Sequence, residues 1–240
     1  MRLDKMLSNS GYGTRSTITK MIRGGLVTVN GTVIKDSGYH VKETDEVLLN
    51  GSATVQKDNL YFVFDKPDGV LTAMEDKRLP TVADYIPAEI KNLKLSPVGR
   101  LDYHTTGLLI ITNDGDLSHR LTSPKYKIPK RYLVTYKGAL LDNSHIEEAA
   151  SGMTLTDMDK PIKLAPANLE LLSDNQAILT LTEGKTHEVR RIISAWGREV
   201  LELRRISLGA LELPEDSIPG TLTELNEEQV LQLKKETGLI

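Results

Sequence analysis

The sequence contains no cysteine, one tryptophan and two phenylalanines among its 240 residues. Without cysteine, the chain can form no disulfide, no thiolate nucleophile and no cysteine-ligated metal site. No apolar run approaches the roughly 20 residues that span a membrane. The first residues, MRLDKMLSNSGYG, lack the apolar core of a signal peptide. We therefore expect a cytoplasmic protein that does not enter a membrane.

Patterns typical of metal sites and of common hydrolases are also missing. The five histidines are scattered, with no pair at metal-ligand spacing. No serine lies in a Gly-x-Ser-x-Gly turn, and no glycine-rich phosphate loop follows the first strand candidate. The sequence therefore contains no pattern typical of a metal site or of a doubly wound nucleotide-binding fold.

Charge is distributed unevenly along a chain whose net charge is −3. Residues 1–31 contain one acid, Asp4, and five cations: Arg2, Lys5, Arg15, Lys20 and Arg23. Residues 120–137 contain no acid and six cations: Arg120, Lys125, Lys127, Lys130, Arg131 and Lys137. The stretch after Leu211 is acidic and offsets both segments. This asymmetry can create a basic face that binds a polyanion, although solvated faces without a partner would give the same pattern.

Residues 1–52 are predicted to form a small separate domain. Thr14 can cap a short helix that has one apolar face. Asn30-Gly31 between two short apolar runs predicts a tight hairpin, because this pair suits the positive φ angles of a type I′ turn. The whole segment resembles the S4 RNA-binding domain. In that family a helix pair and the following loop contact RNA backbone, which implies RNA contacts for five basic residues: Arg2, Lys5, Arg15, Lys20 and Arg23.

A linker is predicted at 53–59, followed by a larger domain over 60–240. Strand candidates lie at 60–64, 108–112, 132–136, 177–182 and 200–203, and helix candidates lie near 81–85, 117–122, 144–151 and 186–196. The alternation is irregular, which favours an α+β fold over a doubly wound nucleotide-binding fold. We expect a small α/β domain followed by a larger domain with a mostly antiparallel mixed sheet.

Asp102 is the first candidate for a chemical role. It lies in VGRLDYHTTGLLIITNDG (98–115), just before an apolar run that is typical of a buried strand. A lone Asp near a strand start is usually a turn or cap residue. The strand could instead hold a reactive carboxylate in place, and Gly107 would let another backbone approach closely. By elimination, Asp102 is the leading nucleophile candidate.

A second segment, EGKTHEVRR (183–191), leads from a strand into a helix. Apolar residues at helical spacing form one stripe of that helix: Val189, Ile192, Ile193 and Trp196. Arg190 lies on the flank of this stripe, near the helix start. A solvated helix face would explain Arg190 equally well, and spacing alone does not place it beside Asp102.

Four segments in this order resemble the motifs of RNA pseudouridine synthases: KPDG (66–69), GRLDYHTTG (99–107), KRYLV (130–134) and EGKTHEVRR (183–191). The resemblance extends from about residue 61 to 209. The preceding S4-like segment, SHRLTSP at 118–124 and the total length resemble the RsuA-like branch of that family. Members of this branch modify one uridine of 16S (small-subunit) ribosomal RNA, at the pseudouridine-516 site.

The resemblance implies roles for individual residues and a reaction without a cofactor. Asp102 would be the nucleophile, Tyr132 the active-site tyrosine and Arg190 the basic partner of Asp102. Glu188 departs from the pattern, since the family commonly has Gln there, and this puts fine substrate positioning in doubt. RNA contacts are expected from six further residues: Lys66, Arg100, Lys130, Arg131, Lys185 and Arg191.

Three alternatives remain at this point. The same chemistry could act on a uridine of 23S (large-subunit) rRNA, or the protein could be a non-catalytic S4-type RNA-binding protein. A glycosidase-like hydrolase would need a second carboxylate about 5–10 Å from Asp102, for which Asp114, Asp116 and Glu183 are nominal candidates. The expected partner is ribosomal RNA, partly assembled with ribosomal proteins, and the protein is expected to be a monomer.

Overall fold

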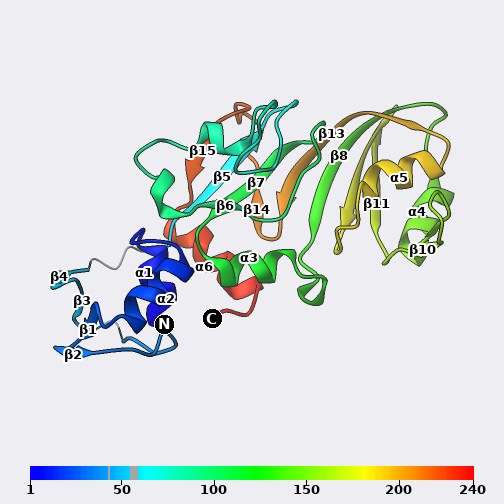
Figure 1. The fold of residues 1–240 in the computed structure, drawn as a ribbon. Helices are drawn as coiled ribbons and strands as arrows, with labels where there is room; N and C mark the ends of the chain where they lie inside the picture. Colours follow the sequence, from blue (N-terminus) through cyan, green and yellow to red (C-terminus); the bar gives the residue numbers. More distant parts are fainter. Residues whose placement is uncertain (43, 55–58) are drawn as a thin grey trace. The chain divides into compact units, whose positions relative to one another are not determined.

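The computed structural model describes residues 1–42, 44–54 and 59–240 (Figure 1). The chain forms two compact units, residues 1–60 with 87–95 and residues 61–86 with 96–240. The predicted domain boundary at residue 60 places 87–95 in the second domain, whereas in the structure this segment packs with the first unit. Within the first unit, Lys94 Nζ of this segment donates to Ser8 Oγ (2.6 Å) and to the carbonyl of Gly13. Most of the predicted linker, 55–58, lies outside the described residues.

The first unit consists of two helices and a four-stranded sheet in the order β2-β1-β3-β4. Thr14 caps the second helix, since its Oγ1 accepts from Thr17 N at 3.0 Å, and Asn30 and Gly31 turn the β1–β2 hairpin with positive φ. Both features confirm the sequence predictions. The elements are α1 (Leu3–Asn9), α2 (Arg15–Arg23), β1 (Val27–Val29), β2 (Thr32–Val33), β3 (Val47–Leu49) and β4 (Ser52–Ala53).

The second unit is organised around a nine-stranded sheet. Seven strands follow the order β11-β12-β8-β13-β7-β5-β15, while β14 pairs with β13 and β6 with β7. Among the described strands only β13 and β7 run parallel, which confirms the predicted α+β class. The bounds are β5 (Tyr61–Lys66), β6 (Ser96–Pro97), β7 (Thr106–Thr112), β8 (Lys130–Lys137), β11 (Asn168–Ser173), β12 (Gln176–Leu181), β13 (Glu199–Leu208), β14 (Leu211–Glu212) and β15 (Leu222–Glu224).

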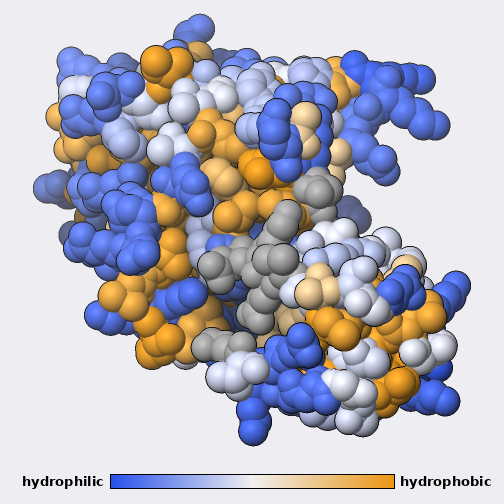
Figure 2. All heavy atoms as spheres, turned by 90° about the vertical axis from the view of Figure 1, so that its left-hand side faces the viewer, coloured by the Kyte–Doolittle hydropathy of each residue, from blue (hydrophilic) through white to orange (hydrophobic). Residues whose placement is uncertain are grey.

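Helices and one small ribbon surround this sheet. Their bounds are η1 (Val82–Tyr85), α3 (Gly115–Thr122), η3 (Pro124–Tyr126), α4 (Asn143–Ser151), β9 (Thr154–Leu155), β10 (Ile162–Lys163), α5 (Glu188–Ala195) and α6 (Glu227–Glu236), and η2 (Lys91–Leu93) belongs to the first unit. Within the described ranges, every helix is too short or too polar to cross a bilayer. On the face in Figure 2, apolar residues are interspersed with hydrophilic ones.

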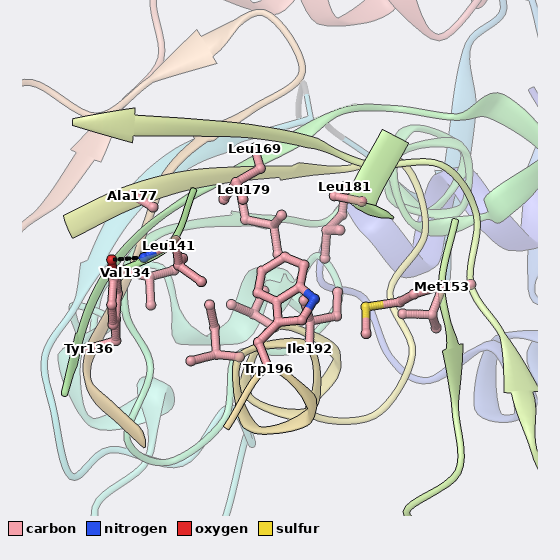
Figure 3. Packing of buried hydrophobic residues seen from close by; sticks show 14 of the residues in the cluster. Val134, Tyr136, Leu141, Met153, Leu169, Ala177, Leu179, Leu181, Ile192 and Trp196 are labelled. Atoms are coloured by element: carbon pink, nitrogen blue, oxygen red, sulfur yellow. Dashed lines mark hydrogen bonds between the residues drawn. The ribbon is translucent and has the colours of Figure 1, made fainter. Parts of the chain in front are cut away.

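The apolar stripe predicted for 186–196 anchors α5 to the sheet. Val189, Ile192, Ile193 and Trp196 are all buried in one cluster with residues of β8, β11 and β12. Figure 3 shows the Trp196 ring among these side chains, and its Nε1 donates to Glu148 Oε2 at 2.9 Å. Burying a large aromatic side chain stabilises the fold by roughly 2–3 kcal/mol. The start of α5 is thereby fixed against the sheet.

A second cluster buries the strand that follows Asp102. Leu108 and Ile110 of β7 pack with Leu117 of α3 and Leu233 of α6, all fully buried. Gly107 has φ of +97°, and a Cβ at this position would collide with the backbone of Arg205 in β13. Gly107 therefore permits the close approach of β7 and β13 that the sequence analysis anticipated.

Candidate active site

Asp102 lies in a loop between β6 and β7 that is held from several directions. Thr72 brackets the preceding residue, Leu101: its Oγ1 donates to the carbonyl (2.7 Å) and accepts from the amide (3.2 Å). On the other side of Asp102, Gly69 N donates to the carbonyl of Tyr103 at 3.1 Å. These bonds fix the backbone on both sides of the carboxylate.

Lys66, at the end of β5, completes this support. Its side chain is fully buried, and Nζ donates to the carbonyls of Pro67 (3.0 Å), Tyr103 (3.2 Å) and Thr105 (2.9 Å). Burial lowers the pKa of Lys66 to about 8, while the nearby carboxylate of Asp102 acts in the opposite direction. The prediction that Lys66 contacts RNA phosphate is therefore wrong, because its ammonium has no access to solvent and supports the Asp102 loop instead.

Asp102 and Tyr132 line the same two adjoining cavities. The smaller cavity, of about 80 Å³, has apolar walls from Leu181, Val189 and Leu203. The larger cavity, of about 440 Å³, extends past Val98, Leu121 and Leu208. Both cavities share six lining residues: Arg100, Asp102, Tyr132, Gly184, Lys185 and His187. The structure thus brings together Asp102, Tyr132, Arg100 and Lys185 of the predicted site.

His187 is a further basic residue close to Asp102, and it was not among the site residues predicted from the sequence. Its Nε2 lies 3.5 Å from Asp102 Oδ1. His187 adopts the left-handed conformation (φ 51°) at the start of α5, which turns the chain from the loop into the helix. The only hint in the sequence was its place inside the EGKTHEVRR segment.

Glu188 contributes a buried carboxyl group to the smaller cavity. Its Oε2 accepts from Lys185 N at 2.7 Å, and Oε1 is buried without a hydrogen-bond partner among the described residues. Burial raises the pKa of Glu188 to about 7, and the neighbouring Glu183 acts in the same direction. Near neutral pH this group is therefore partly protonated and can donate a hydrogen bond, as the amide of a Gln would.

Arg190 lies on α5 but points to a different hollow. Its Nη2 donates to the carbonyl of His104 at 2.7 Å, and it lines a surface hollow together with Asp68 and Arg204. Because His104 is two residues from Asp102, this bond also restrains the Asp102 loop. The ion pair expected between Arg190 and Asp102 does not occur among the described contacts; at this position Asp102 has His187 instead.

Lys130, for which an RNA contact is predicted, lies in the interior of the second unit. Only 9% of it is exposed, and Nζ donates to the carbonyl of Ile128 at 3.0 Å. It lines the larger cavity beside Arg205 of β13, which is 3% exposed. Burial and the charge of Arg205 lower the pKa of Lys130 to about 8. Lys130 is thus part of the cavity wall, and Arg205 is a basic cavity residue that the sequence analysis missed.

Several of the other basic candidates already form ion pairs with acidic side chains of the protein. Arg191 forms a two-pronged ion pair with Asp157 (2.6 and 2.7 Å), and Arg131 lies 3.6–3.8 Å from Glu212 and Glu170. Of the five candidates in the first unit, Lys5 is half-buried and the other four are exposed; two of these four, Arg2 and Arg15, bind Asp4. The remaining two, on α2, are Lys20 and Arg23.

The carboxylates that a glycosidase would need are committed elsewhere. Asp114 caps α3 and accepts from the Tyr61 hydroxyl (2.8 Å), Asp116 lies on α3, and Glu183 binds Lys185. Among the described residues, no three His, Cys, Asp or Glu side chains form a group that could hold a metal ion.

Comparisons with known proteins match this architecture. The RNA pseudouridylate synthase family matches residues 60–195, and the S4 domain family matches residues 1–47. The chain belongs to the RNA pseudouridine synthase family. It is similar to the ribosomal small subunit pseudouridine synthase A of Pasteurella multocida, with 38% identity over 98% of this chain and 100% of that protein. The corresponding Escherichia coli protein is 35% identical over 96% and 98% of the two chains.

Structural similarity agrees with the sequence matches. A crystal structure of a pseudouridylate synthase superposes with a TM-score of 0.68 at 34% identity, covering 97% of this chain and 99% of that one. The protein is therefore an RNA pseudouridine synthase with an amino-terminal S4 domain. This result sets aside both the hydrolase and the non-catalytic alternatives.

Proposed function

We propose that this pseudouridine synthase converts one uridine of small-subunit ribosomal RNA to pseudouridine, with Asp102 as the nucleophile and without a cofactor. The observation that carries the proposal is the shared cavity of Asp102 and Tyr132 beside His187. The relatives named for the small subunit support the choice of RNA. We assign uridine 516 of 16S rRNA as the target, and a large-subunit uridine is the alternative.

The reaction is an isomerisation. The bond between ribose C1′ and uracil N1 breaks, a bond between C1′ and C5 forms, and the hydrogen on C5 is replaced while N1 gains one. Oxidation states and atoms balance within the nucleotide, so the chemistry requires no redox partner. The target base must first leave its stack, at a cost of a few kcal/mol that is lowest in loops.

Asp102 acts in its ionised form, either by attacking C1′ or by removing a ribose proton to give a glycal. The Lys66 ammonium and the His187 ring both lie near this carboxylate. Tyr132 stacks on the flipped base, and its hydroxyl assists removal of the C5 proton. The apolar walls from Leu181, Val189 and Leu203 exclude water from the separated base and sugar.

Arg190 contributes by holding the Asp102 loop through His104, and we propose that it pairs with Asp102 only when RNA is bound. Arg100 and Lys185 line both cavities and bind backbone phosphate, as do Arg131 and Arg191. RNA displaces the acidic partners of Lys185, Arg131 and Arg191. The S4 domain adds sequence-independent attraction. The enzyme acts as a cytoplasmic monomer on rRNA that is partly assembled with proteins.

Carbodiimide mapping of pseudouridine tests both reaction and target. Ribosomal RNA is compared between cells with the gene, cells without it, and cells without it that carry a plasmid copy. We expect one small-subunit signal to vanish on deletion and to return with the plasmid. Loss of a large-subunit signal instead would overturn the assignment to the small subunit, and unchanged signals in both RNAs would overturn the proposed function.

A further inference from the structure

The guanidinium of Arg205 is buried with part of its hydrogen-bonding capacity unused. Nε donates to the carbonyl of Leu108 at 2.8 Å, which fixes the orientation of the side chain. Nη2 is buried and has no hydrogen-bond partner among the described residues. An unpaired donor on a buried charged group is costly and rare in folded proteins. This nitrogen therefore suggests a ligand that the free protein lacks.

Lys130 lies beside Arg205 on the neighbouring strand β8. The positive charge of Arg205 disfavours protonation of Lys130, so the two cations repel each other, and Glu188 offsets this only in part. Glu188 is itself partly protonated near neutral pH because burial raises its pKa to about 7. Two buried cations without a fully charged partner are unfavourable, and an anion between them would remove the repulsion.

Both cations line the larger cavity, which also contains Asp102 on its wall. Its volume of about 440 Å³ lies within the usual range for sites that hold a small ligand. The remaining lining includes apolar or small residues (Val98, Gly99, Leu121, Thr122 and Leu208) and three further basic residues (Arg100, Lys185 and His187). Among these basic residues only Lys130 and Arg205 are buried.

We propose that Lys130 and Arg205 form a buried subsite for a backbone phosphate adjacent to the reacting uridine. The inference rests on the proposed function, since it assigns part of the same cavity to the substrate RNA. A phosphate oxygen can accept from Arg205 Nη2 and from the Lys130 ammonium together, and such charge-assisted bonds are strongest away from water. A neutral uracil carbonyl would leave the two charges uncompensated. Fixing this phosphate sets the position of the ribose relative to Asp102.

Binding of two small probes tests the subsite. Uridine 3′,5′-bisphosphate and uridine differ only in their phosphates, and calorimetry measures the affinity of the full chain for each. We expect the unaltered protein to bind the bisphosphate at least about tenfold more tightly than uridine, which corresponds to one favourable charged contact. Lys130→Met and Arg205→Met should both lose most of this preference.

Lys235→Met is the matched control, because it removes one exposed positive charge from α6. Its preference should equal that of the unaltered protein. If Arg205→Met fails to fold in thermal melts, Lys130→Met still tests the subsite, since it keeps the length of the side chain. RNA binding provides a second readout: the salt slope should fall by about 0.7 when one phosphate contact with single-stranded RNA is lost.

A missing preference in the unaltered protein, or an unchanged preference in Lys130→Met, would overturn the subsite. The subsite would also be overturned if Lys130→Met lowered turnover at saturating RNA while its preference for the bisphosphate remained intact. That result would indicate that these cations stabilise the departing uracil. Failure of the subsite leaves the rRNA mapping result unaffected. Conversely, an unchanged rRNA map with the preference present would overturn only the proposed function.

Discussion

Cations in the two units serve different purposes. On α2 of the first unit, Lys20 and Arg23 are exposed to water. In the second unit, Lys66 and Arg205 are at least 97% buried and bind backbone carbonyls. Exposed charges attract RNA at long range and are screened by salt. Buried charges instead fix loops and define where a ligand can bind, so a basic residue in a sequence predicts long-range attraction of RNA only when it remains exposed.

Among the substitutions that test this comparison, Lys66→Met should have the largest effect, because it removes a buried cation. The three carbonyl oxygens that Nζ binds would lose their donor, at roughly 1 kcal/mol each, so we expect a loss of about 3 kcal/mol in the free energy of unfolding. Pseudouridine formation should also fall, because the Asp102 loop loses its support. Urea unfolding measures the change, with exposed Lys77→Met as control. Equal effects of the two substitutions would contradict this role.

Glu188→Gln tests a buried acid in the same cavity. The folded-state pKa of about 7 lies above the ordinary value of 4.5. As pH rises from about 4.5 to 7, the unfolded chain releases this proton first, so stability falls over that window. The variant lacks this loss, and between pH 4 and pH 8 it should gain up to about 3 kcal/mol relative to the unaltered protein.

Unfolding in urea across this pH range measures the effect. The exposed Glu215→Gln variant should follow the unaltered protein at every pH. The free energies of unfolding of Glu188→Gln and the unaltered protein could instead differ by the same amount at pH 4 and pH 8. That result would show that Glu188 ionises as an ordinary surface acid.

Changing Lys20 and Arg23 together to Ala tests the role of the exposed cations. Two lost phosphate contacts should lower the salt slope of RNA binding by about 1.4 and the affinity at low salt by about tenfold. Turnover at saturating RNA should remain unchanged, since neither residue lies in the cavities. A salt titration of RNA binding measures both quantities, with the Lys77→Ala/Lys235→Ala pair as control. An unaltered slope would place the first unit's RNA contacts elsewhere.

Thr14→Ala should have the smallest effect. The Thr14 side chain caps α2, the helix that carries the exposed cations, and losing a cap of this kind costs about 1 kcal/mol. Thermal melting detects this loss, and exposed Ser16→Ala should change stability by less. Similar melting temperatures for the two variants would mean that the cap contributes nothing.

The sequence predicts elements well where periodicity and turn chemistry agree. The stripe of α5, the Asn30-Gly31 hairpin and the buried strand after Asp102 are all present. The edge strand β11 and the polar helix α6 were missed, since most of their residues are exposed and carry little hydrophobic pattern. Local signals identify an element only when one of its faces is clearly apolar.

Burial of charged residues was harder to predict than the elements. Lys66 and Lys130 occupy strand positions that become buried only when distant strands pair, which no local pattern reports. A signal existed for Arg205: it alternates with Leu203 and Ser207 along β13, and all three are buried. Likewise, the contact of His187 with Asp102 depends on the left-handed turn before α5.

The identity of the nucleophile is tested most directly by Asp102→Asn, which keeps the size of the side chain and removes its charge. RNA labelled with tritium at uracil C5 releases tritium on isomerisation, while fluorescence anisotropy reports RNA affinity. We expect turnover to fall by at least about a thousandfold, as for the loss of other enzyme nucleophiles, with affinity changed less than about twofold because a carboxylate adds little attraction to a polyanion. Full tritium release by the variant would show that Asp102 is not the nucleophile.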